Sequence, residues 1–101
     1  MNVQITSRKF KAKDSLKEYI HKELKSLEKY FDDIREANVV LYYTHQKDSI
    51  KTAEILLQVP GKSLVAEVSS DDFTKSVHGC VQKLERQLKD LKAKLKKKVK
   101  A

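Results

Sequence analysis

The 101-residue sequence predicts an α+β fold with the element order β-α-β-β-β-α. Two observations predict it. Four segments alternate apolar and polar residues, which is typical of half-buried strands, and two segments repeat apolar residues at intervals of three and four, which is typical of amphipathic helices. Because each helix has one apolar face, we expect both helices to pack on one face of a four-stranded sheet.

The first strand is expected at residues 2–8, where apolar and polar side chains alternate. A basic connector follows, and the apolar spacing then changes to that of a helix between residue 14 and about residue 31. Asp14 or Ser15 can cap this helix, and Ser15 with Glu18 has the spacing of a capping box. We therefore expect the first helix to begin at Asp14.

Three further strands are expected in the middle of the chain. Residues 37–44 are rich in β-branched and aromatic side chains, residues 46–49 are a polar loop, and residues 50–59 alternate again. Pro60–Gly61 predicts a tight turn, because proline presets one dihedral and glycine permits the positive φ that follows. Alternation resumes over residues 64–68, so we expect the last two strands to form a hairpin.

The last helix is expected from about Asp71, with Ser70, Asp71 or Asp72 as its N-cap and lysines at its other end. Gly79 lies inside this helix, where glycine costs roughly 1 kcal/mol relative to alanine, and only a closely packed neighbour would account for it. Cys80 lies on the apolar stripe, where a small buried thiol is the usual interpretation.

Composition limits the class of protein. The length fits one domain, which we assign to residues 1–101 with residues 96–101 as a basic C-terminal tail that can fray. No apolar run approaches the roughly 20 residues of a membrane span, and the single cysteine agrees with a reducing compartment, so we expect a cytoplasmic protein. The formal charge of +8 indicates a polyanionic partner.

Catalytic and metal-binding patterns are absent from the sequence. The three histidines lie in different predicted elements, and His78 and Cys80 diverge by about 200° on a helix. No glycine-rich loop is present that could hold a nucleotide phosphate. We therefore expect no catalytic residue, no metal site, no cofactor and no small-molecule substrate.

Basic residues recur on defined faces of both predicted helices. In the first helix three lysines form one column opposite the apolar stripe. In the last helix one flank of the stripe is expected to hold Lys75, Lys83, Arg86 and Lys97, and the other Lys89, Lys92 and Lys96. The alternative is a solvated face that acidic residues balance. No exposed aromatic ladder is expected, so the pattern favours recognition of the backbone and shape of structured RNA. The candidate RNA-binding residues are Lys22, Lys25, Lys29, Lys75, Lys83, Arg86, Lys89, Lys92 and Lys96.

Three motifs make the sequence similar to a known family. LEKYFD at residues 27–32, the hairpin around Pro60–Gly61, and Asp72-Phe73 leading into KLERQL at residues 83–88 resemble the ribosome hibernation promoting factors, which include the ribosome-associated inhibitor. The resemblance runs over nearly the whole chain in the same element order.

The resemblance implies a factor that binds the small ribosomal subunit during stress or stationary phase. It further implies that the protein occupies the channel of messenger RNA and transfer RNA, contacts ribosomal RNA and inhibits translation. Since the chain stops at Ala101, we expect the short form, without a domain that pairs ribosomes. Carried over by position, the implied contact residues are Lys25, Lys29, Lys83, Arg86, Gln87, Lys92 and Lys94.

Two alternatives to a hibernation factor remain open at this point. A general double-stranded RNA-binding module has a similar α-β-β-β-α core and would bind free duplexes about as well as ribosomes. A protein-interaction module with a basic tail would bind an acidic partner instead. In each case we expect a monomer when the protein is free.

Overall fold

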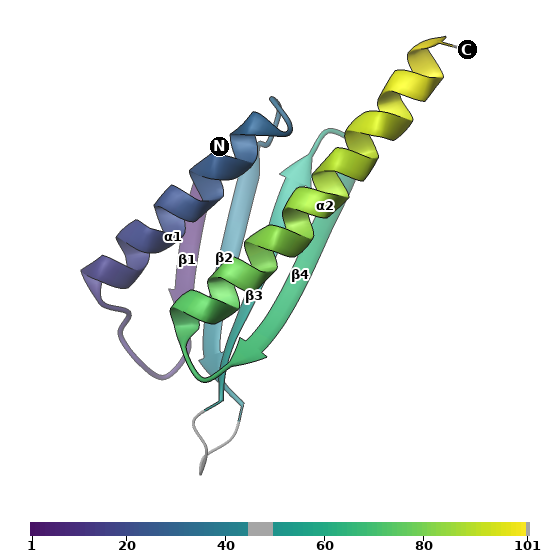
Figure 1. The fold of residues 1–101 in the computed structure, drawn as a ribbon. Helices are drawn as coiled ribbons and strands as arrows, with labels where there is room; N and C mark the ends of the chain where they lie inside the picture. The colour runs from purple at the N-terminus through teal and green to yellow at the C-terminus, as the bar shows by residue number, and fades with distance from the viewer. Residues whose placement is uncertain (45–49, 101) are drawn as a thin grey trace.

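The computed structural model describes residues 1–44 and 50–100, and for residues 96–100 it describes the backbone alone. The expected element order is confirmed, with a short 3-10 helix in addition (Figure 1). The expected loop at residues 46–49 lies outside the described residues. The elements are β1 (Asn2–Ser7), α1 (Asp14–Ser26), η1 (Leu27–Lys29), β2 (Glu36–Tyr43), β3 (Lys51–Val59), β4 (Lys62–Ser70) and α2 (Phe73–Lys100).

The four strands form one mixed sheet in the order β1-β2-β3-β4. β1 and β2 run parallel, and α1 is the crossover connection that parallel neighbours require. β3 pairs antiparallel with both β2 and β4. The predicted hairpin is confirmed, because Val59 lies opposite Lys62 and Gly61 between them has a φ of +74°, which glycine adopts without strain.

Both helices cover the same face of the sheet, as predicted, and the core lies between them and the strands (Figure 1). Leu24 of α1 and Leu84 and Leu88 of α2 are fully buried, in one core cluster with Val39 and Ile55 of the sheet. Each such burial contributes roughly 1.5–3 kcal/mol. The apolar stripes read from the sequence are therefore the faces that hold the helices in place.

The other face of the sheet has no helix over it in the described structure. Val65 is 48% exposed there, and Leu56 lies opposite it. Glu54 and Glu67 also lie opposite each other on this face, and Tyr42 donates a hydrogen bond to Glu67 over 2.9 Å. Carboxylates thus gather on the open sheet face, away from the lysines of the helices.

The start of α1 differs from the prediction. Lys13 is the N-cap, with extended backbone angles and no side-chain hydrogen bond, so neither Asp14 nor Ser15 caps the helix and the capping box of Ser15 with Glu18 does not form. Asp14 is instead the first helical residue, where its negative charge suits the helix dipole. The α-helix also ends earlier than expected, at Ser26, and continues as η1.

The start of α2 is capped by one of the predicted residues. Oδ1 of Asp72 accepts hydrogen bonds from the amide and the hydroxyl of Thr74, each over 2.8 Å. These two bonds hold the pKa of the Asp72 carboxyl below its usual range. Within the described residues, no helix is long and apolar enough to cross a membrane, and α2 itself is rich in lysine.

Close packing of α2 on β4 explains Gly79. A Cβ at this position would lie 3.0 Å from Cγ1 and 3.2 Å from Cγ2 of Val68, so a side chain has almost no room. The next residue, Cys80, is buried as expected, and its thiol donates to the carbonyl oxygen of Ala53 over 3.2 Å. Burial raises the pKa of the Cys80 thiol to about 11.

Candidate nucleic-acid interface

A hydrogen-bonded group holds the two helices side by side. Tyr19 donates to Oε1 of Glu23 over 2.7 Å, and Nδ1 of His78 on α2 lies 2.8 Å from the same oxygen. Partial burial opposes the charge on Glu23, but the hydrogen bonds from Tyr19 and His78 outweigh it and lower the pKa of Glu23. Burial, helped by the Glu23 carboxylate, raises the pKa of Tyr19 to about 12.

This contact fixes the direction in which the lysines of α1 point. Tyr19 and Glu23 face α2, and Ile20 and Leu24 are buried against the sheet. Successive residues turn by about 100° around a helix, so the remaining outer face carries the predicted column. All three members of that column are exposed: Lys22 and Lys25 of α1, and Lys29 of η1, which continues it.

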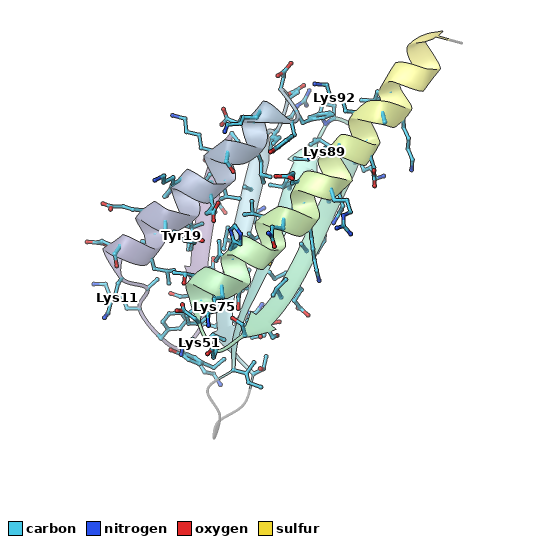
Figure 2. All side chains as sticks on the ribbon, in the orientation of Figure 1. Lys11, Tyr19, Lys51, Lys75, Lys89 and Lys92 are labelled. Atoms are coloured by element: carbon cyan, nitrogen blue, oxygen red, sulfur yellow. The ribbon has the colours of Figure 1, made fainter. Side chains whose placement is uncertain are left out.

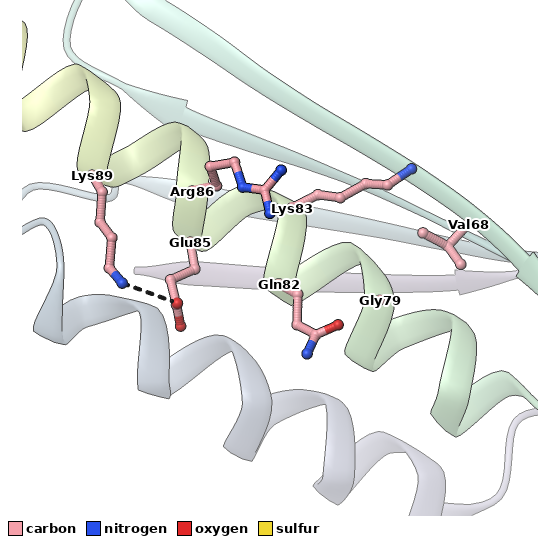
Figure 3. Close-up of a pocket in the computed structure, with 7 residues that line it drawn as sticks. All are labelled: Val68, Gly79, Gln82, Lys83, Glu85, Arg86 and Lys89. Atoms are coloured by element: carbon pink, nitrogen blue, oxygen red, sulfur yellow. Dashed lines mark hydrogen bonds and ion pairs between the residues drawn. The ribbon is translucent and has the colours of Figure 1, made fainter.

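The basic residues of α2 point in three directions rather than two. Lys89 and Lys92 lie on the side of α1 (Figure 2). Lys75 and Arg86 lie on the outer side of the helix, opposite its buried residues. Lys83 reaches toward β4 instead (Figure 3). The expectation that Lys83 shares one flank with Lys75 and Arg86 is therefore wrong.

Lys83 and Gln87 are tied to the edge of the sheet. Nζ of Lys83 donates to the carbonyl oxygen of Glu67 over 3.3 Å, and Nε2 of Gln87 donates to that of Val65 over 3.0 Å. The rise over four helical residues is similar to the rise over two strand residues. Lys83 and Gln87 are therefore spaced to reach Glu67 and Val65. Both bonds occupy backbone acceptors on the outer edge of β4, which an exposed edge strand otherwise leaves unpaired.

Side chains from η1, from the residue after it and from α2 converge just beyond the C-terminal end of α1. A hollow of about 260 Å³ is lined by Lys29, Tyr30, Lys89, Lys92 and Ala93. Nζ of Lys89 lies 5.0 Å from the centre of the Tyr30 ring, a cation–π distance. Three lysines thus lie around one hollow, an arrangement that suits an anion such as a phosphate.

A second hollow, of about 700 Å³, lies along the outer side of α2 (Figure 3). Gly79 and Val68 are part of its lining, and Lys83, Arg86 and Lys89 supply its positive charge. Glu85 is the carboxylate in its lining and forms an ion pair with Lys89 over 3.2 Å. Arg86 can hold a phosphate with two parallel hydrogen bonds, which a lysine cannot do.

Carboxylates neutralise few of the candidate residues. Besides Lys89, Lys75 forms an ion pair with Asp71, also over 3.2 Å, and exposed pairs of this kind contribute only about 0–1 kcal/mol. Lys96 belongs to α2, but its side chain is outside the described part. Among described side chains, no ion pair joins a carboxylate to Lys22, Lys25, Lys29, Lys83, Arg86, Lys92 or Lys94.

An aromatic cluster at the other end of the helices escaped the sequence analysis. Phe10, Tyr43 and Phe73 pack together, and Tyr43 is 44% exposed. The sequence did not predict this single exposed ring. The topology contained the signal. Because β1 and β2 are parallel, the connector after β1 begins at the end of the sheet where the last residue of β2 lies.

The chain is similar in sequence to known proteins. Residues 3–96 match the model of a family described as Sigma 54 modulation protein / S30EA ribosomal protein. The chain is 32% identical over 99 residues to the ribosome hibernation promoting factor of Escherichia coli strain K12, covering 95% of this chain and 98% of that protein.

Two solved structures are similar in fold. A ribosomal subunit interface protein from Coxiella burnetii matches 92% of this chain with a TM-score of 0.82, and the N-terminal domain of Thermus thermophilus Protein Y matches 90% with a TM-score of 0.80. Both are 28% identical to this chain, which covers 99% of each of them.

Proposed function

Because the chain belongs to the Sigma 54 modulation protein / S30EA ribosomal protein family, we propose that it binds the small ribosomal subunit through the outer surface of α1 and α2. The protein is a ribosome hibernation factor and not an enzyme. In this proposal it acts in the cytoplasm as one domain over residues 1–101. There it occupies the channel of messenger RNA and transfer RNA and inhibits translation during stress.

The convergence of Lys29, Lys89 and Lys92 on one hollow carries the proposal. Folded ribosomal RNA presents closely spaced phosphates, and each cation that meets one releases bound counterions. The charge separation between the helices and the open sheet face, where Glu54 and Glu67 lie, gives the protein one side that attracts RNA and one that does not. Such contacts recognise backbone and shape rather than base sequence.

Neutralising exposed lysines of this surface tests the proposal. The helix-surface variant combines Lys25→Gln, Lys29→Gln and Lys92→Gln. Its affinity for purified small subunits should fall, and the slope of log affinity against log salt should become shallower by roughly 2 to 3, since each lost phosphate contact removes roughly 0.7–0.9. Co-sedimentation at several salt concentrations measures both quantities.

A matched control removes the same charge elsewhere. Lys17→Gln, Arg35→Gln and Lys62→Gln lie away from the two hollows of the interface and should leave the affinity and the salt slope nearly unchanged. Equal losses in both variants would contradict the proposal, because net charge alone would then explain the binding. Competition by free RNA duplexes as effective as that by small subunits would instead favour a general double-stranded RNA-binding module.

A further inference from the structure

We propose that a second RNA contact lies at the opposite end of the helices, where a hollow beside Tyr43 holds an unpaired nucleotide of single-stranded RNA. This inference rests on the proposed function for its class of partner. The hollow measures about 740 Å³, within the roughly 300–1,000 Å³ of small-molecule sites. Its lining combines aromatic side chains with lysines.

The aromatic wall of this hollow is held in place. The rings of Phe10 and Phe73 are stacked with centroids 5.0 Å apart and planes 11° apart, and Tyr43 packs edge-on against both at 5.2 and 5.4 Å. Phe73 is buried, whereas Tyr43 is 44% exposed. The wall therefore presents the exposed ring of Tyr43, held by aromatic neighbours that are already packed.

The backbone of Arg8 and Lys9, which leads into Phe10, has a defined conformation as well. The amide of Arg8 donates to the carbonyl oxygen of Leu41 over 2.9 Å, which extends the pairing of β1 and β2 by one residue. Lys9 then takes a φ of +64°, an uncommon conformation for a residue with a side chain. This turn brings Phe10 back toward the core, where it stacks on Phe73.

Three lysines line the hollow beside the aromatic wall. The lining includes Lys11, Lys13 and Lys51 and contains no carboxylate among the described residues. Nζ of Lys51 donates to the backbone oxygen of Asp71 over 3.1 Å, so its ammonium group is held near the hollow. Figure 2 shows Lys11 and Lys51 at the end of the molecule opposite Lys89 and Lys92.

An accessible aromatic ring with cations around it suits an unpaired nucleotide. A base can stack on the ring while its flanking phosphates meet the lysines, which is how proteins bind single strands without reading their sequence. A base inside a duplex is already stacked and cannot do this. The surface of α1 and α2, by contrast, offers cations for phosphates of either form of RNA.

Two probes of equal charge separate base stacking from charge attraction. Fluorescently labelled hexaadenylate RNA and an abasic ribose–phosphate chain of the same length can be titrated with the full-length protein while anisotropy is recorded. Wild type should bind the hexaadenylate more tightly than the abasic chain. Tyr43→Ala should weaken hexaadenylate binding by roughly 5- to 150-fold, the loss of one stacked base, and Tyr43→Phe should retain it.

The neighbouring tyrosine provides a matched control. Tyr42 precedes Tyr43 on β2 but belongs to the open sheet face, where it bonds to Glu67, so Tyr42→Ala should leave hexaadenylate binding unchanged. Equal binding of the two probes, or equal effects of Tyr42→Ala and Tyr43→Ala, would overturn the proposal. Displacement of hexaadenylate by hexaglutamate at equal concentration would also overturn it, since the hollow would then fit an acidic peptide.

Failure of this site and failure of the proposed function give different results. The helix-surface variant should have a lower affinity for small subunits and should still bind hexaadenylate more tightly than the abasic chain. If that variant binds small subunits like wild type, the proposed function fails. The nucleotide site beside Tyr43 fails on a separate result, if Tyr43→Ala binds hexaadenylate like wild type.

Discussion

Replacing Gly79 of α2 with alanine changes the free energy of unfolding in two opposing ways. Alanine in the interior of a helix is more favourable than glycine by about 1 kcal/mol. At this position, however, its Cβ would lie 3.0 Å from Cγ1 of Val68, and overpacking of this kind costs roughly 1–3 kcal/mol. We therefore expect Gly79→Ala to lower the free energy of unfolding by roughly 0–2 kcal/mol, although the substitution favours the helix.

A second substitution separates the two contributions. Val68→Ala removes both γ carbons and leaves Cβ of residue 68 at 3.5 Å, which is ordinary van der Waals contact. In that background Gly79→Ala should raise the free energy of unfolding by about 1 kcal/mol. The four proteins form a double-mutant cycle, with an expected coupling energy of roughly 1–3 kcal/mol between the two positions.

Urea unfolding followed by circular dichroism measures the cycle. The wild-type protein, both single variants and the double variant should share one slope against urea, so that midpoints report stability alone. If Gly79→Ala stabilises both backgrounds by the same 1 kcal/mol, the close approach of α2 to β4 at this point does not exist in solution.

Three further expectations concern other contacts. The lowered pKa of Glu23 means that its contribution to stability is present above its unfolded pKa of about 4.5 and lost as pH falls. The stability advantage of wild type over Glu23→Gln should therefore shrink between pH 7 and pH 3 in urea unfolding, and a constant difference would contradict this. Cys80 should react with a thiol reagent at neutral pH far more slowly in the native protein than in urea, because it is buried and its pKa is raised to about 11. Gln87→Ala should lower the free energy of unfolding by up to about 1 kcal/mol through loss of its bond to Val65, and an unchanged urea midpoint would argue against that bond.

The fold could be predicted because its signals are local. Alternation along the strands, the spacing of Leu84 and Leu88, and the Pro60–Gly61 turn each act over a few residues. The cap of α1 could not be predicted from side chains, because Lys13 ends the extended connector through its backbone angles alone. The sequence offered Asp14 as a better acceptor, but the helix begins one residue too early for it to cap.

The direction of the basic residues depended on what packs beside each helix. A helical wheel shows that Lys83 borders the apolar stripe, but it does not show that the edge of β4 lies there with open carbonyl groups. Lys92 borders the same stripe on the other side and lines a hollow together with Lys29 of η1 instead. The exposed ring of Tyr43 was missed for a similar reason, because its partners come from two other parts of the chain.

Directed hydroxyl-radical cleavage of ribosomal RNA tests most directly which face of the protein meets the ribosome. An iron chelate can be attached to a cysteine introduced at Lys25, Lys92 or Val65, since the native Cys80 is buried. Bound to small subunits, the chelate at positions 25 and 92 should cleave ribosomal RNA strongly, and the chelate at position 65 on the open sheet face should cleave it weakly. Equal or stronger cleavage from position 65 would contradict the assignment of α1 and α2 as the RNA-binding surface.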